Sequence, residues 1–244
     1  MNPTLTLATA RRILSQLRHD PRTVVMLVLV PSLLMVLLRY VFNSPLIFSR
    51  VAPALLGVFP FLIMFLITSV TTLRERTTTT LERLMTLPIG KLDVLFGYAL
   101  AFGSVAVVQV AVAAGISVTW LGLEVSGSLW TLLLIAVLDA LLGMALGLFV
   151  SAFATSEFQA IQFMPLFVLP QILLCGLFVP RGDMGWLLNW LSNVMPLSYA
   201  VDALSHVTRS TTFDATLTRN LLIVAACAIA ALILGAATLR RRTP

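Results

Sequence analysis

Six long apolar segments most tightly constrain what this chain can fold into. They cover approximately residues 23–42, 51–73, 94–120, 129–152, 158–179 and 221–239. A helix needs about 20 mostly apolar residues to cross the hydrocarbon core of a bilayer, and each segment is close to that length. Because backbone polar groups cannot remain unpaired in lipid, we predict an all-α membrane protein with six transmembrane helices.

The composition favours lipid as the solvent of this chain. Of its 244 residues, 59% are hydrophobic and 11% are charged, whereas soluble domains have about 25% charged residues. The net charge of +6 comes from basic residues that flank the apolar segments. No continuous basic patch with interleaved aromatic residues is present, so we expect no nucleic-acid partner. Cys175 and Cys227 lie within apolar segments and behave as small hydrophobic residues.

The distribution of lysine and arginine predicts the orientation of the chain. Eleven of the sixteen basic residues fall on one side of the predicted spans, in the segments before residue 23, between 74 and 91, and after 239. The positive-inside rule then places both termini in the cytoplasm of a multi-pass plasma or inner membrane protein. The tryptophans agree with this topology, since all fall at the predicted outer interface: Trp120, Trp130, Trp186 and Trp190.

Two segments outside the spans have apolar character of their own. In the cytoplasmic segment 1–22, the apolar residues Ile13, Leu14 and Leu17 lie beside the basic residues Arg11, Arg12 and Arg18. This pattern predicts an amphipathic helix on the inner leaflet, or else a basic flank that only sets topology. The outer connection 180–217 begins with an apolar stretch too short to span. It predicts a re-entrant or interfacial hairpin, or else a surface loop with aromatic anchors.

A charged loop at residues 74–92 separates the second and third spans. Thr78, Thr79 or Thr80 could cap a short helix that Pro88 would end. Leu81, Leu84 and Met85 would then share one face, an arrangement suited to docking on a soluble partner. The alternative is a solvated loop whose arginines only set topology.

Two motifs in this chain resemble the permeases of ABC-2 type transporters. The first is Arg-Glu-Arg at 74–76, Leu-Glu-Arg-Leu-Met at 81–85 and Thr-Leu-Pro-Ile-Gly-Lys at 86–91, which is similar to the family's coupling loop. It departs from the usual form by a threonine where glycine is common, and by Leu87 between Thr86 and Pro88. The second motif, at 195–204, resembles the segment that precedes the family's last span. The resemblance implies a single ABC-2 type transmembrane domain over residues 1–244.

The resemblance also implies partners and a function. Two permease subunits would pair as a homodimer or heterodimer, each docked on one of two copies of an ABC-type ATPase that binds ATP and Mg²⁺. The coupling residues would be Arg74, Glu75, Arg76, Leu81, Glu82, Arg83 and Leu84. The expected activity is export of a hydrophobic or amphiphilic drug-like or antibiotic-like compound, as in multidrug efflux and antibiotic resistance. Export of a polysaccharide or lipid-linked glycan is the alternative within the family.

The chain carries no motif for catalysis of its own. Gly90 and Lys91 are not preceded by the glycine that a phosphate-binding loop requires. His19 and His206 lie outside the predicted spans, so neither could serve a protease site within the membrane. We therefore expect a non-catalytic subunit that binds no cofactor or metal itself.

Four polar residues fall within the predicted spans. Asp139 is a functional candidate because a carboxylate in the membrane is costly, and a hydrogen bond to a neighbouring helix is the alternative role. Gln109, Gln162 and Gln171 could line a substrate path or join helices. Proton-coupled secondary transport through Asp139 is a further alternative, although such folds usually show two related halves and none is visible here.

Small residues form a stripe along the fourth predicted span. Gly143 and Gly147 make a GxxxG motif, which Ala136, Ala140 and Ser151 extend. Such stripes let two helices approach closely. We predict helix packing within the subunit, with a seam between two subunits as the alternative.

Overall fold

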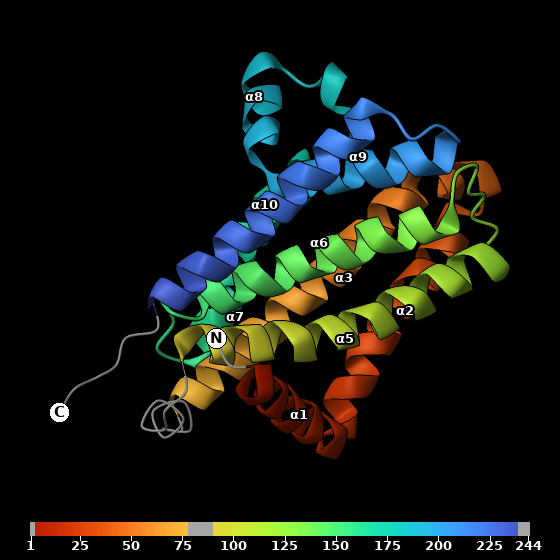
Figure 1. Cartoon of the computed structure of the whole chain (residues 1–244). Helices are drawn as coiled ribbons and strands as arrows, with labels where there is room; N and C mark the ends of the chain where they lie inside the picture. The colour runs from red at the N-terminus through yellow and green to blue at the C-terminus, as the bar shows by residue number, and fades with distance from the viewer. Residues whose placement is uncertain (1–2, 78–89, 239–244) are drawn as a thin grey trace.

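The computed structural model of the chain describes residues 3–77 and 90–238. Within these ranges there is no β-strand, and six helices are long and apolar enough to cross a membrane. They are α2 (Pro21–Phe42), α3 (Pro45–Thr77), α5 (Lys91–Thr119), α6 (Leu129–Val150), α7 (Glu157–Leu174) and α10 (Ala215–Thr238), labelled as in Figure 1. The predicted all-α membrane fold with six spans is therefore confirmed.

The shorter helices lie at the two ends of the bundle formed by the spans (Figure 1). Helix α1 (Pro3–His19) lies at one end, called here the α1 end, where α3 finishes and α5 begins. The opposite end, called the α9 end, carries the 3₁₀ turn η1 (Arg181–Asp183), α8 (Trp186–Val194) and α9 (Pro196–Arg209). The loop between α5 and α6 also lies there, because the N–H of Gly127 donates to the Val207 carbonyl at 2.9 Å.

Local sequence explains where several helices begin and end. Asp20 accepts a hydrogen bond from the Thr23 N–H at 3.3 Å, and Pro21 opens the next helix, so α1 and α2 are separate. Asn43 has a φ of 45°, a left-handed conformation that ends α2. Helix α1 folds back onto the start of α5, where Gly97 makes room: a Cβ there would lie 2.6 Å from Thr9.

Helix α6 is the centre of the bundle and packs between α3 and α10 (Figure 1). Its two motif glycines face α3 so closely that a Cβ on Gly143 would lie 2.3 Å from the Phe61 carbonyl oxygen, and one on Gly147 would lie 2.4 Å from that of Phe65. The hydroxyl of Thr68 on α3 adds a hydrogen bond to the Met144 carbonyl at 3.2 Å. The prediction that the GxxxG motif packs helices within the subunit is confirmed.

The spans differ in how much of their surface the chain itself covers. Among the 18 most apolar consecutive residues of each helix, 67% are buried in α3 and 61% in α6. The same share is 22% in both α2 and α7. The apolar faces of α2 and α7 are therefore left for lipid or for another protein.

Three predicted span boundaries differ from the structure by five residues or more. The second span begins at Pro45 rather than near residue 51. The fifth span ends at Leu174 rather than near residue 179, because Gly176 adopts a φ of 93° that takes the chain out of the helix. The last span begins at Ala215 rather than near 221, because Asp214 accepts a hydrogen bond from the Leu217 N–H at 2.9 Å and starts the helix earlier.

The connection 180–217 is more helical than the sequence predicted. The expected apolar stretch forms α8, whose Trp186 and Trp190 side chains are exposed. The motif at 195–204, which carried no predicted secondary structure, lies in α9. One face of α9 is buried against α3, α6 and α10, through residues that include Leu197, Val201 and Leu204. That buried face makes α9 part of the core rather than a surface loop.

Candidate functional site

Glu75 joins three helices at the α1 end of the bundle. It lies near the end of α3, and its side chain is 9% exposed. Arg12 of α1 donates to both carboxylate oxygens, at 3.0 and 3.1 Å, and the Tyr98 hydroxyl of α5 donates to one of them. With its amide oriented to satisfy both neighbours, Gln16 donates to Glu75 at 3.1 Å and accepts from Arg12 at 3.2 Å. A buried carboxylate with this many donors fixes α1, α3 and α5 relative to one another.

The residues on either side of Glu75 contact other helices. The Arg74 guanidinium donates to both oxygens of Glu157 at the start of α7, at 3.0 and 3.3 Å. This pair is exposed to solvent, so its contribution to stability is small and its role is to set geometry. Arg76 turns the other way and lines a small cavity with Tyr98 of α5 and Gly235 of α10.

The three predicted coupling residues that the structure describes therefore connect to different helices. Four others, Leu81, Glu82, Arg83 and Leu84, lie outside the described residues, as does the whole of the short helix predicted in the loop 74–92. The structure describes the α3 side of this loop, residues 74–77, which we call the loop base. That base is tied through Glu75 to α1 and α5, and through Arg74 to α7.

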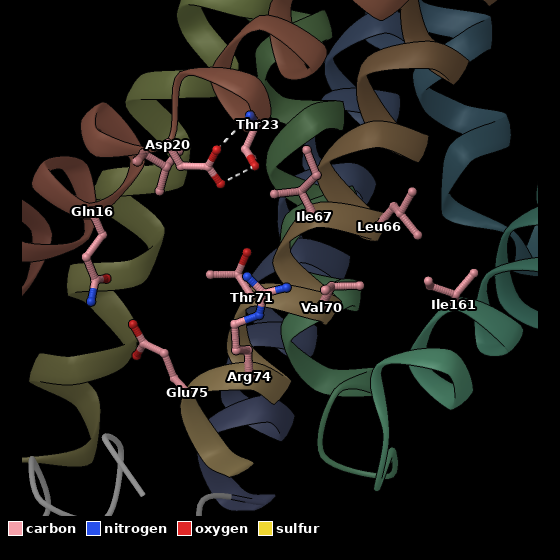
Figure 2. A pocket seen from close by; sticks show the side chains of 11 residues that line it. Gln16, Asp20, Thr23, Leu66, Ile67, Val70, Thr71, Arg74, Glu75 and Ile161 are labelled. Atoms are coloured by element: carbon pink, nitrogen blue, oxygen red, sulfur yellow. Dashed lines mark hydrogen bonds between the residues drawn. The ribbon is translucent and has the colours of Figure 1, made fainter. Parts of the chain in front are cut away.

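A cavity of about 520 Å³ opens beside this base, between α1, α2, α3 and α7 (Figure 2). Its walls have two chemical characters. One is apolar and comes from α3 and α7, through Leu66, Val70 and Ile161. The other is polar and includes Gln16, Asp20, Thr23, Arg74 and Glu75. Cavities of this size, mostly apolar with a few convergent polar groups, are typical ligand sites.

Asp20 is the acidic group of this cavity that has no ion-pair partner among the described residues. Glu75 is matched by Arg12, and Arg74 by Glu157. The Thr23 hydroxyl and then its N–H lower the pKa of Asp20, since hydrogen bonds to the ionised form stabilise it. Figure 2 shows these two bonds, which leave the carboxylate at the rim of the cavity. Asp20 therefore places a negative charge beside an apolar wall, where the Arg74 charge also acts on it.

Asp139 is enclosed in the interior of the bundle, away from this cavity. Its side chain has no exposed surface, and neither carboxylate oxygen has a hydrogen-bond partner among the described residues. Gly57 of α3 makes room for it, because a Cβ there would lie 3.2 Å from Oδ2 and 2.9 Å from Leu204 of α9. The structure thus places Asp139 where α3, α6 and α9 meet.

The three predicted glutamines have three different environments. Gln109 on α5 is fully buried, and its amide has no partner among the residues described. Gln162 on α7 is exposed. Gln171 is buried: it donates to the Phe167 carbonyl at 2.9 Å and accepts from the Leu197 N–H at 3.4 Å, which joins α7 to α9. No hydrogen bond in the described part of the chain connects any of these residues to Asp139.

Sequence reasoning missed Arg12, Gln16, Asp20 and Tyr98 as members of the site. Arg12 looked like one of several basic residues that set topology, and Asp20 did not stand out as a functional candidate. A signal was available for Tyr98, because a hydroxyl two turns into an apolar helix needs a partner. No local signal, however, identifies Glu75 as that partner.

Comparison with known proteins gives two matches. The ABC-2 type transporter family matches residues 4–208, which is most of the chain. ABC transporter G family member 20 of Dictyostelium discoideum is 26% identical over 156 residues, or 64% of this chain. The chain spans about a fifth of that relative's length, since the match covers 21% of it.

Proposed function

Because the chain belongs to the ABC-2 type transporter family, we propose that it is the permease subunit of an ATP-driven exporter of amphiphilic small molecules. Family membership makes it a membrane-spanning transporter subunit that works with an ATP-hydrolysing partner. Beyond family membership, we propose the direction of transport and the class of substrate. The main support for the proposal is the family match over residues 4–208. The cavity beside the loop base adds support for an amphiphilic substrate.

The proposed assembly contains two permease subunits and two ATPase subunits. The second permease is another copy of this chain or a related one, and it would cover the apolar faces of α2 and α7. ATP and Mg²⁺ bind to the ATPase, and this chain performs no catalysis. The α1 end faces the cytoplasm of an inner or plasma membrane, in agreement with its many arginines.

In this proposal Glu82 and its neighbours Leu81, Arg83 and Leu84 dock in a groove of the ATPase. Movement of the loop would reach the bundle through its base. Glu75 would pass it to α1 and α5, and Arg74 would pass it to α7. One displacement at the loop would thus act on both sides of the cavity in Figure 2 at once.

The cavity supports a cationic amphiphile as the transported compound. A positively charged head group would lie against Asp20, and an apolar body would lie against Leu66, Val70 and Ile161. The site is at the α1 end, where in the proposed orientation an amphiphile would arrive from the cytoplasm or the inner leaflet. Drug-like compounds with a positive charge and aromatic rings have this chemistry.

Charge reversal at the loop tests the coupling part of the proposal. Tagged chain would be purified in mild detergent from its native host, and the proteins that accompany it identified. We expect an ABC-type ATPase with the wild-type chain and its loss from Glu82→Lys. The matched control is Glu124→Lys, an equal charge reversal at an exposed site of the α9 end. If no ATPase accompanies the wild type even after crosslinking, the proposal is wrong.

Transport into inside-out vesicles tests the substrate class. The vesicles would contain the chain with its ATPase, and the probe would be rhodamine 6G, a lipophilic cation. We expect ATP-dependent accumulation that falls severalfold in Asp20→Asn and in Val70→Phe, which fills the cavity. Asp183→Asn, an exposed carboxylate at the α9 end, should have no effect. Equal transport by Asp20→Asn and the wild type would exclude Asp20 as the site of the head group.

A further inference from the structure

A second pocket lies at the α9 end of the molecule, on the opposite side of the bundle from the cavity described above. It has a volume of about 310 Å³ and lies between η1, α8, α9 and α10. Its lining is mainly polar and charged, and it includes Arg181, Asn189, Asn193, Tyr199, Asp202 and Arg219. We call it the α9–α10 pocket. Its composition differs from that of a void left by loose apolar packing.

Arg181 is held rigidly at the base of this pocket. Its Nε donates to the Ser192 hydroxyl at 2.8 Å, and its two terminal nitrogens donate to Asp202 and to Asn193. The guanidinium also lies over the Tyr199 ring, 5.2 Å from the centroid. Only 15% of the arginine side chain is exposed. A cation fixed by four neighbours costs little further ordering when it binds an anion.

Arg219 supplies a second positive charge, which interacts electrostatically with Asp202 although no ion pair joins the two side chains. It lies in the first turns of α10 and forms no ion pair or hydrogen bond with any residue in the described ranges. Asp202 is the one acidic residue in the lining, and Arg181 already binds it. The lining therefore has two cationic groups and one anionic group, which leaves a net charge of +1. The side-chain amides of Asn189 and Asn193 donate to the Arg181 carbonyl at 3.0 Å and to Asn189 Oδ1 at 3.3 Å, which leaves one N–H of each for a ligand.

An apolar groove continues from this pocket along α10. It is shallow and open, because all of its lining residues belong to α10, and it shares Arg219 and Ile223 with the pocket. Leu222 and Ala226 extend its wall. These positions are three or four residues apart and lie on one helix face, and from Arg219 to Ala226 they cover about 10 Å. A positively charged pocket and an apolar groove thus meet at Arg219.

We propose that the α9–α10 pocket and the adjoining groove bind one anionic phospholipid. The phosphate lies between Arg219 and Arg181, and part of an acyl chain lies against Ile223 and Ala226. The groove favours a lipid over a free anion, because inorganic phosphate would contact only the charged pocket and leave the apolar groove empty. The positive lining decides between anionic and zwitterionic lipids. The site requires only that the chain spans a membrane, and it is independent of what is transported.

Native mass spectrometry of the detergent-solubilised chain, with any partner that co-purifies, tests this site. The probes are dioleoyl phosphatidylglycerol, dioleoyl phosphatidylcholine and inorganic phosphate. We expect one phosphatidylglycerol to bind about tenfold more tightly than phosphatidylcholine, as loss of a charge-assisted contact of this kind predicts. Arg219→Gln should abolish that preference. Ala226→Phe, which fills the groove, should weaken binding of both lipids.

The matched control is Arg209→Gln, which removes an exposed arginine at the end of α9, outside both the pocket and the groove. It should bind phosphatidylglycerol as the wild type does. The proposal is overturned if the wild type binds both lipids equally. It is also overturned if Arg209→Gln lowers binding as much as Arg219→Gln, which would indicate attraction to surface charge in general. If millimolar phosphate displaces phosphatidylglycerol completely, and Ala226→Phe binds this lipid as the wild type does, the pocket is a site for small anions and the proposal is wrong.

Discussion

Substitution of Gly143 by alanine should destabilise the bundle at its most closely packed contact. The added Cβ would lie 2.3 Å from the Phe61 carbonyl oxygen, whereas ordinary van der Waals contact begins at 3.4 Å. Because the obstacle is backbone, no side-chain rotation can relieve it. Helices α3 and α6 must therefore separate by about 1 Å, which weakens the dispersion contacts beside the site.

The cost can be bounded from known effects. Overpacking of a core costs about 1–3 kcal/mol, and alanine recovers up to about 1 kcal/mol through its higher helix propensity than glycine. We expect a net loss of about 2 kcal/mol in the free energy of unfolding. For a chain of this size that corresponds to a decrease of about 4–8 °C in Tm.

The buried thiol of Cys175 provides the assay. The side chain is fully buried, whereas that of Cys227 is partly exposed. In a Cys227→Ser background, a maleimide dye that fluoresces on reaction with a thiol would report unfolding as Cys175 becomes accessible. The melting temperature would be compared between this background and the same background with Gly143→Ala.

Gly115 is the matched control for this experiment. It lies within α5, and a Cβ there would have no atom within 4 Å. Gly115→Ala should leave Tm unchanged or raise it slightly, because only helix propensity changes. The reasoning is refuted if Gly143→Ala melts at or above the temperature of its background, or if Gly115→Ala loses as much stability as Gly143→Ala.

Three further outcomes are expected. Glu75→Gln removes the charge that Arg12 binds at 3.0 Å and should cost about 2 kcal/mol in the thiol assay, so an unchanged Tm would contradict the role of Glu75 in joining helices. Asp139→Asn should leave ATP-dependent transport unchanged, because the carboxyl is enclosed; loss of transport with a normal Tm would instead favour proton coupling. Asp214→Ala should lower Tm more at pH 7 than at pH 3. The Leu217 N–H chiefly lowers the pKa of Asp214, so its stabilisation is present above the ordinary value of 3.8 and lost as the pH falls through the lower folded value; equal loss at both pH values would refute this account.

The spans could be predicted because their signal is local. Apolar character over about 20 residues is visible in the sequence, and so is the GxxxG motif that brings α6 against α3. The ends of the helices were less predictable. Gly176 ends α7 while the sequence around it stays apolar, and Asp214 starts α10 before its strongly apolar part. Backbone conformation and capping, rather than hydropathy, set those boundaries.

The candidate site was predicted only in part, because its contacts join distant residues. The motif identified Arg74, Glu75 and Arg76, and the structure supplies their surroundings. Glu75 meets Arg12, which is 63 residues earlier, and Arg74 meets Glu157, which is 83 residues later. Several arginines were equally plausible partners for Glu75 in the sequence. Only the packing of α1 against α5 selects Arg12, and that packing depends on Gly97 and Thr9.

The long helix α3 has a mechanical consequence. It runs for 33 residues, or about 50 Å, from the α9 end to the base of the charged loop. Carbonyl oxygens of α3 lie directly against Gly143 and Gly147 of α6, and the short Thr68 side chain is also in contact at Gly147, so little at this interface can absorb a displacement. A displacement of Thr77 should therefore pass along the proline-free part of α3, residues 61–77, and tilt α3 and α6 together, whereas Pro53 and Pro60 interrupt the hydrogen bonding of the rest of the helix. Beyond Pro60, Gly57 of α3 lies against Leu204 of α9, so α9 is the next element that such a tilt would reach.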